Sequence, residues 1–192
     1  MNKLNLEDNI IYEVLITTKS NNTYHTKPFG VQFRDNKVIL NLYPNNTISN
    51  LKNNGQFIIE ITNNPLLFTK ATLNKLDGTD YNKGHLCDSS VVIKASVESI
   101  DTKKISNKYG ISTLFSVIAS IKDYEILDSK PPIISRATNK IIDLLIDYTR
   151  LEFFNQKQLN NYYKNLEDTA LFINKTGNDL HKISIELLKE SK

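Results

Sequence analysis

Residues able to bind an anion are concentrated in segment 41–51, where a strand pattern gives way to a short helical one. Pro44-Asn45-Asn46 breaks the strand, and Thr47 is a good N-cap for a helix over Ile48–Asn53 that ends at Gly55. The first turn of a helix has unpaired N–H groups, and here amide and hydroxyl side chains add further polar groups. The segment is therefore a candidate phosphate site, although a simple turn and cap would use the same residues.

A second irregular segment, Lys27-Pro28-Phe29-Gly30-Val31, interrupts an otherwise extended stretch. Pro28 cannot donate to a ladder and Gly30 has no side chain to pack, so we expect this strand to be an edge, bulged or closely approached. Backbone groups that Pro and Gly leave unpaired become available to a planar polar ligand. Together the two segments predict a ligand site at the rim of a barrel.

The elements that must position these segments are strands, up to about residue 127. Ile10–Thr18 is dense in β-branched residues, and Lys37–Tyr43 alternates with the period of a strand. A helix is expected from Pro65 to about Leu73, and a polar loop over Lys75–Ser89. Further inward-facing rows are expected at Phe57, Ile59 and Ile61, at Val91, Ile93, Ala95 and Val97, and at Phe115, Val117, Ala119 and Ile121, the last two strands being joined through Lys103–Gly110.

Pro131-Pro132 marks a boundary, because neither residue continues a strand or helix interior. Beyond it the apolar residues recur every three or four positions, which predicts about three amphipathic helices, with Gly177 as a C-cap between the last two. We therefore expect a β-rich α+β chain with an antiparallel β-barrel over 1–130 and a helical extension over 131–192. Arg136, near the start of the predicted helix Ser135–Phe153, is a further candidate anion ligand.

The composition makes several function classes improbable. Lys and Arg exceed Asp and Glu by only 24 to 21, and the excess is spread along the chain, whereas nucleic-acid binders usually concentrate their cations. Cys87 is the single cysteine, so no disulfide within the chain and no Cys-based zinc cluster can form. A secretion signal and a run of about 18 apolar residues are both missing. We expect a cytoplasmic protein that binds neither nucleic acid nor membrane.

Familiar catalytic motifs are absent, including Gly-x-Ser-x-Gly, the phosphate-loop Gly-x-x-x-x-Gly-Lys, His-Glu-x-x-His and Gly-x-Gly-x-x-Gly. His25, His85 and His181 fall in different elements, so we expect no metal site. Asp143 and Asp147 are one helical turn apart and are best explained as an exposed ion-pair face. These residues leave the catalytic groups unassigned.

The order and spacing of several short motifs resemble a flavoprotein family found largely in methanogenic archaea and known as domain of unknown function 447. The motifs are Ile11-Tyr12-Glu13-Val14 with Thr17-Thr18, Lys27-Pro28-Phe29-Gly30-Val31, Val38-Ile39-Leu40-Asn41-Leu42-Tyr43, Thr47 with Asn50-Leu51, Asn64-Pro65-Leu66-Leu67-Phe68, Ser135-Arg136-Ala137 and Tyr148-Thr149-Arg150-Leu151. This resemblance implies a six-stranded Greek-key split barrel that binds FMN near the interface of a homodimer.

Carried onto this chain, the resemblance places the backbone of Lys27–Val31, with Lys27, Phe29, Gly30 and Val31 as contacts, against the isoalloxazine. It places Asn45, Asn46 and Thr47 at the phosphate, and Tyr43 and Arg136 complete the expected contact set. The chain departs from the family pattern at two places: Asn45-Asn46 stands where a Gly-Ser type of turn is expected, and Asp143 where a glutamate is expected.

The leading hypothesis is an FMN-binding flavoprotein, a redox protein or flavin-dependent oxidoreductase of unknown substrate that takes electrons from a small-molecule donor. FMN itself would supply the reaction, so an unassigned catalytic side chain is no objection. The alternatives are a dimeric module that binds flavin or another ligand without turnover, and a purely structural barrel.

Overall fold

The computed structural model describes Leu4, Leu6 and residues 11–21, 23–107, 110–128 and 136–191. The chain divides into a barrel unit, Met1–Thr62 with Gly78–Lys130, and a helical unit, Asn63–Asp77 with Pro131–Lys192. The division differs from the expected one in a single segment, 63–77, which joins the C-terminal helices instead of the barrel. The boundary predicted at Pro131-Pro132 lies outside the described residues.

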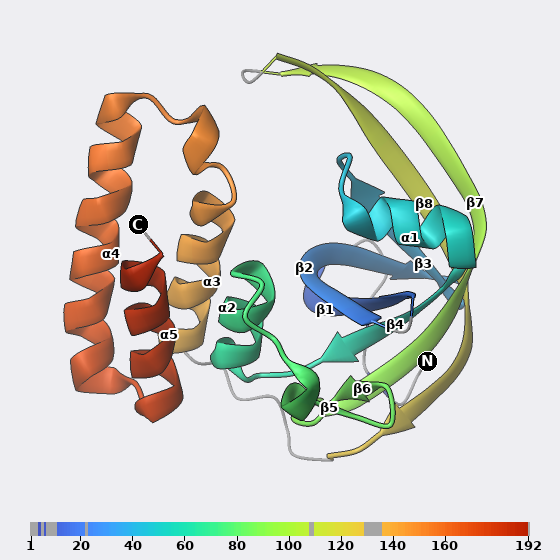
Figure 1. Ribbon diagram of the computed structural model, residues 1–192, viewed down its shortest axis with the longest axis horizontal. Helices are drawn as coiled ribbons and strands as arrows, with labels where there is room; N and C mark the ends of the chain where they lie inside the picture. The colour runs from blue at the N-terminus through green and yellow to red at the C-terminus, as the bar shows by residue number, and fades with distance from the viewer. Residues whose placement is uncertain are drawn as a thin grey trace. The chain divides into compact units, whose positions relative to one another are not determined.

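Six antiparallel strands close the barrel in the order β1-β2-β3-β8-β7-β4 (Figure 1). This confirms the antiparallel barrel and the C-terminal helices that the sequence predicts, and the six strands that the family resemblance implies. The elements of the barrel are β1 (Tyr12–Ser20), β2 (Thr23–Arg34), β3 (Lys37–Leu42), α1 (Asn46–Asn54), β4 (Gln56–Ile61), β7 (Val91–Asn107) and β8 (Gly110–Ile126).

The barrel core is filled by the alternating apolar residues that the strand patterns predict. On β3, for example, Val38, Leu40 and Leu42 are each at most 1% exposed. The predicted rows on β4, β7 and β8 also belong to this core, with Val97, Phe115 and Ile61 partly buried at its margin. Period-two alternation therefore located the inner face of these strands correctly.

The connection between β7 and β8 is shorter than the sequence suggested. The two strands pair as far as Asn107 opposite Gly110, so the stretch Lys103–Gly110, expected as a connection, is largely strand. A two-stranded ribbon beyond the core needs no buried row, and its polar residues therefore look like a loop in the sequence. Figure 1 shows this ribbon as two long curved strands.

Two ladders of the barrel stop before their strands do. The β2–β3 ladder extends from Arg34 opposite Lys37 only to Val31 opposite Leu40. The β1–β4 ladder has three pairs, from Leu15 opposite Glu60 to Thr17 opposite Ile58. The strands therefore separate at two places, which we call the β2–β3 gap and the β1–β4 gap.

Helix α1 lies at the end of the barrel where both gaps open. Its residues Ile48 and Leu51 belong to the barrel core, and Asn50 Nδ2 donates to Thr18 Oγ1 on β1 at 2.9 Å. The helix begins directly after β3 and ends directly before β4. One end of α1 is therefore next to the β2–β3 gap, and the other is next to the β1–β4 gap.

The segment expected as a polar loop, Lys75–Ser89, contains short elements: η2 (Gly78–Asp80), β5 (Tyr81–Asn82) and β6 (His85–Leu86). Glu60 on β4 holds the segment in place, since its carboxylate accepts from the Leu86 N–H and the Ser89 hydroxyl, both at 2.6 Å, and from the Thr17 hydroxyl. Glu60 is completely buried. This carboxylate satisfies backbone and side-chain donors that would otherwise lack partners.

The helical unit consists of α2 (Pro65–Thr72), α3 (Arg136–Tyr148), η3 (Leu151–Phe153), α4 (Gln156–Thr176) and α5 (Asp179–Glu190). Asn64 caps α2 with Pro65 in its first turn, as predicted. Capping boxes begin α4 at Asn155 and α5 at Asn178, and Gly177 is the C-cap of α4. Among the described residues, no helix is long and apolar enough to cross a bilayer.

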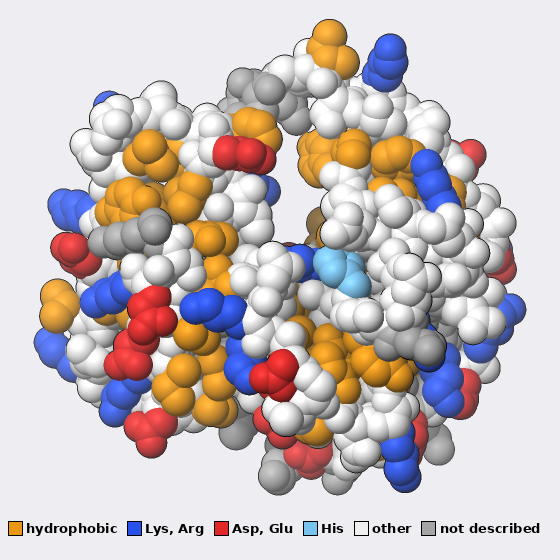
Figure 2. Space-filling model, in the orientation of Figure 1, with side chains coloured by type: hydrophobic (Ala, Val, Ile, Leu, Met, Phe, Trp, Pro, Cys, Tyr) orange, Lys and Arg blue, Asp and Glu red, His pale blue; other side chains and the backbone are white. Residues whose placement is uncertain are grey.

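Charged side chains of both signs are mixed on the surface. On the face drawn in Figure 2, Lys and Arg are interspersed with Asp and Glu over the described residues. This distribution agrees with the small net charge of +3 and resembles an ordinary solvated surface.

Candidate functional site

The strand-to-helix turn after β3 forms as predicted, but with a different cap. Asn45 is the N-cap of α1: it has an extended backbone (φ −163°), and its Oδ1 accepts from Ile48 N at 2.9 Å. The prediction of Thr47 as the cap was wrong, and the helix starts at Asn46 instead of Ile48. Asn caps a helix as well as Thr does, and Asn45 precedes Thr47 in the chain.

Thr47 lies in the first turn of α1, and its side chain is completely buried. Its hydroxyl has no hydrogen-bond partner among the described residues. A buried hydroxyl without a partner costs roughly 1–3 kcal/mol, so such groups call for an explanation. Its neighbours Asn45 and Asn46 are exposed. The side-chain amides of Asn45 and Asn46 are thus accessible to a ligand, and the Thr47 hydroxyl beside them is a buried group that lacks a partner among the described residues.

The Lys27–Val31 segment forms part of β2, and its side chains alternate between the two faces of the strand. Val31 belongs to the barrel core, and the partly buried Phe29 packs against it. The β1–β2 ladder has no break in register, so Lys27 and His25 continue the same inward-facing row toward the end covered by α1. Thr18, which accepts from α1, lies opposite His25.

Gly30 is on the outer side of β2, opposite Glu13 on β1. A Cβ at Gly30 would lie 2.7 Å from Ile11 Cγ2, so the close approach predicted for this glycine is made by a side chain of the same chain. Residues 27–30 pair only with β1, because the β2–β3 ladder has already ended. The missing N–H of Pro28 is therefore tolerated in a stretch that has one ladder neighbour.

Burial changes the acid–base properties of this end of the barrel. Burial lowers the pKa of the His25 imidazole, and the positive charge of Lys27 lowers it further. Burial also lowers the pKa of Lys27 itself. Each shift means that the positive form is disfavoured by loss of solvent. An anion bound beside these groups would favour their positive forms.

The β2–β3 gap brings two of the predicted segments to one place. On β2, residues Lys27–Gly30 lie just beyond the last β2–β3 pair. On the other side of the gap, Tyr43–Thr47 comes after the end of β3. Tyr43 is 48% exposed at this edge. Arg136 is the first residue of α3, in the helical unit, and its role stays a prediction. Sequence reasoning missed His25, although its position two residues before Lys27 was the available signal.

Metal-binding and thiol chemistry find no support in the described residues, where no group of three or more His, Cys, Asp and Glu side chains is suitably placed for a metal. His85 Nδ1 instead contacts the Leu86 carbonyl oxygen at 3.0 Å. Cys87 is exposed, and its Sγ donates to the Thr79 carbonyl oxygen at 3.6 Å. The arrangement at the β2–β3 gap is suited to binding an anionic ligand rather than to side-chain nucleophilic or metal catalysis.

Comparison with known proteins identifies relatives over the whole chain. The uncharacterized protein MJ1453 of Methanocaldococcus jannaschii is 25% identical over 186 residues, which are 93% of this chain and 96% of that protein. The crystal structure of the FMN-bound protein MM1853 from Methanosarcina mazei superposes with a TM-score of 0.78 at 14% identity, covering 100% of this chain and 99% of the other. The styrene monooxygenase flavin reductase of Pseudomonas putida S12 gives a TM-score of 0.46 at 14% identity, over 65% of this chain and 93% of the other.

The family profiles match both parts of the chain. The N-terminal domain profile of the protein family of unknown function DUF447 matches residues 12–126, and a second DUF447 profile matches residues 135–190. The fold of MM1853, itself assigned to DUF447, agrees with this assignment. The chain therefore belongs to the DUF447 family.

Proposed function

We propose that this chain is an FMN-binding redox flavoprotein, acting as an oxidoreductase on a substrate still to be identified. The observation that carries the proposal is the completely buried, unpartnered hydroxyl of Thr47 in the first turn of α1. A family member of the same fold is an FMN-bound protein. The donor set at this turn fits a phosphate, because helix N–H groups and small polar side chains are the usual phosphate ligands.

Residues on both sides of the β2–β3 gap would contact the cofactor. Asn45, Asn46 and Thr47 would bind the phosphate, and Tyr43 would line the edge. The β2 segment Lys27–Val31 would present its backbone to the isoalloxazine where β3 no longer pairs with it. Asn45 already uses Oδ1 to cap α1, so its Nδ2 group would make the phosphate contact. When bound, FMN supplies the redox chemistry, and the protein binds and orients it.

We further propose that the protein is a homodimer with FMN near the subunit interface, as the family resemblance implies. Sedimentation equilibrium should give twice the chain mass of 22.0 kDa. A monomer that still binds FMN at full stoichiometry would remove the interface from the account and leave the cofactor site in place.

The phosphate contact is tested by titrating the purified protein with FMN and with riboflavin, which lacks the phosphate. We expect FMN to bind at least about tenfold more tightly, because charge-assisted hydrogen bonds are worth more than about 1.4 kcal/mol together. Equal affinity for the two flavins would mean that the turn at Thr47 does not hold a phosphate.

Turnover separates a redox enzyme from a module that only binds flavin. The holoprotein should oxidise a reduced nicotinamide or reduced deazaflavin donor continuously in the presence of an electron acceptor. Stoichiometric FMN binding without any turnover on either donor would favour the binding module.

A further inference from the structure

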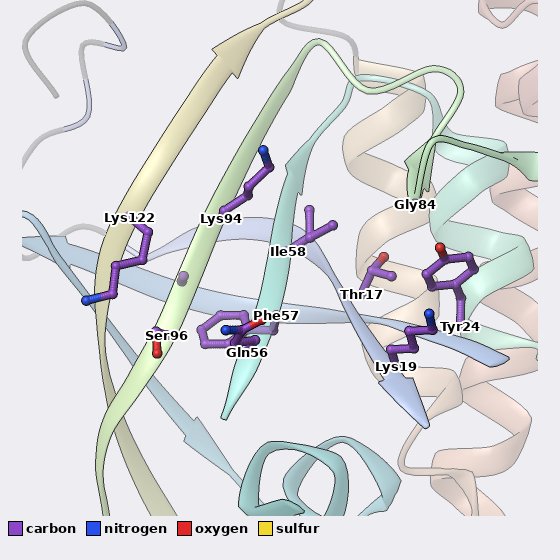
Figure 3. Close-up of a pocket in the computed structure, with 11 residues that line it drawn as sticks. Thr17, Lys19, Tyr24, Gln56, Phe57, Ile58, Gly84, Lys94, Ser96 and Lys122 are labelled. Atoms are coloured by element: carbon purple, nitrogen blue, oxygen red, sulfur yellow. The ribbon is translucent and has the colours of Figure 1, made fainter. Parts of the chain in front are cut away.

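A pocket of about 570 Å³ opens at the β1–β4 gap, away from the turn that holds Thr47. It forms because the β1–β4 ladder stops at Thr17 opposite Ile58 while both strands continue. None of the residues proposed above to bind FMN lines this pocket. Figure 3 shows Thr17, Lys19 and Tyr24 on one side of it, and Lys94, Ser96 and Lys122 on the other.

The floor of the pocket is mostly apolar. Phe57 and Ala95, both buried residues of the barrel core, line it together with the half-buried Ile58. Phe57 and Ala95 pair with each other in the β4–β7 ladder, and Ile58 is the more exposed of the three; β4 has no β1 partner beyond Ile58. A floor of this kind binds the body of an apolar ligand by removing it from water.

One wall of the pocket is the aromatic ring of Tyr24, which a second ring supports. Tyr24 stacks on Tyr81 with ring centroids 4.9 Å apart and an interplanar angle of 27°. The Tyr81 hydroxyl lies 2.8 Å from Thr26 Oγ1, which fixes the second ring. Gly84 packs so closely that a Cβ there would lie 3.1 Å from the Tyr24 hydroxyl oxygen. The wall is therefore rigid and suited to stacking against a flat molecule.

The rim of the pocket is positively charged, because it carries lysines from the three strands β1, β7 and β8. Lys19 Nζ lies 5.9 Å from the centroid of the Tyr24 ring. Lys122 lies in a bulge of β8, between the pairs Lys94 with Asp123 and Ala95 with Ile121. Asp123 offsets one charge, since it is 3.3 Å from Lys94 Nζ. Lys19 and Lys122 contact no carboxylate among the described residues, so the rim keeps a net positive charge.

We propose that this pocket is a second ligand site, which binds a flat, largely apolar molecule carrying an anionic group, such as an aromatic sulfonate or carboxylate. The body of the ligand lies on the apolar floor against Tyr24, and its anionic group lies at the positively charged rim. The site is separate from the turn proposed for the FMN phosphate, because it is at the opposite end of α1.

The experiment is isothermal titration calorimetry of the full chain with naphthalene-2-sulfonate and with the neutral naphthalene-2-sulfonamide, each with and without saturating FMN. We expect one sulfonate per chain, bound about tenfold more tightly than the sulfonamide, since only the sulfonate meets the lysines. FMN should leave sulfonate binding unchanged. Equal affinity for the two probes, or displacement of the sulfonate by FMN, would overturn the proposal.

Variants locate the site. The double variant Lys19→Gln/Lys122→Gln should lower sulfonate affinity about tenfold, to that of the sulfonamide, and leave the sulfonamide unaffected. The control variant Lys157→Gln/Lys164→Gln removes the same charge from exposed positions on α4 and should change the affinity of neither probe. Ser96→Trp should fill the pocket and abolish binding of both probes. Sulfonate binding that survives both the charge variant and Ser96→Trp would place the ligand elsewhere.

FMN binding is measured separately by flavin absorbance, so the two proposals fail independently. Thr47→Val should weaken FMN binding and leave sulfonate binding intact. A protein that binds the sulfonate but no FMN would contradict the proposed function and support the second site.

Discussion

At the scale of single residues, Thr47 is the most informative position, because burial of its hydroxyl costs stability while its proposed role is to bind the FMN phosphate. Its hydroxyl is buried without a partner, which costs stability in the free protein. Thr47→Val should therefore leave the free energy of unfolding unchanged or raise it by about 1 kcal/mol, while FMN affinity falls about tenfold and riboflavin affinity does not change. Urea unfolding and two flavin titrations check this. Equal losses for FMN and riboflavin would contradict the phosphate role.

The pKa of His25 reports the electrostatics of the same end of the barrel. Burial and the charge of Lys27 both lower this pKa below 6.5. Lys27→Gln should raise it without reaching 6.5, since burial is the larger cause. Because protonation of a group with a lowered pKa favours the unfolded state, His25 destabilises the fold as the pH drops through 6.5, and less so in the variant.

NMR titration of the His25 imidazole measures this change directly. Lys103→Gln, an exposed change on β7, is the charge-matched control and should leave the His25 pKa where it is. A Lys27→Gln variant with an unchanged His25 pKa would show that the two side chains do not interact.

Glu60 is a residue whose importance is structural. Its carboxylate accepts from Thr17, Leu86 N and Ser89 while completely buried. In Glu60→Gln one oxygen becomes an amide group that cannot accept, which should cost about 1–3 kcal/mol of unfolding free energy. Glu125→Gln, at an exposed position on β8, should cost nothing measurable. Chemical denaturation of both variants is the test, and equal stability would mean that the network is dispensable.

At the scale of elements, α1 depends on how its C-terminus ends. Gly55 has a left-handed backbone (φ 63°) and donates its N–H to Leu51 O at 2.9 Å. A Cβ at Gly55 would meet nothing within 4 Å, so Gly55→Ala should cost about 1 kcal/mol through backbone strain alone. Gly78→Ala is the matched control, since its Cβ is also unobstructed and its φ is not in that region. Thermal unfolding should separate the two variants.

The elements also show why the sequence predicted some features and not others. Strands with one buried face, such as β3, can be recognised in the sequence because apolar residues recur at every second position. The N-cap of α1 was misplaced because Asn45 and Thr47 are both good caps, and propensity does not choose between them. The hairpin of β5 and β6 was missed because Glu60, distant in sequence, supplies its partners.

At the scale of the whole molecule, both proposed ligand sites lie at gaps in the barrel. Each exists because a ladder ends before its strands do, and the residue pattern of the strands continues without change across that point. The Lys27–Val31 segment could be recognised from its Pro and Gly, since both disturb a ladder. The pocket at the β1–β4 gap could not, because its lysines, tyrosine and apolar floor come from five separate strands.

The central claim is that this fold holds FMN, and the visible absorbance of the purified protein tests it most directly. The account predicts a yellow protein with flavin absorption bands, from which denaturation releases one FMN per chain. Protein purified without the cofactor should bind added FMN with the same stoichiometry. A colourless protein that does not bind added FMN in a titration would contradict the account.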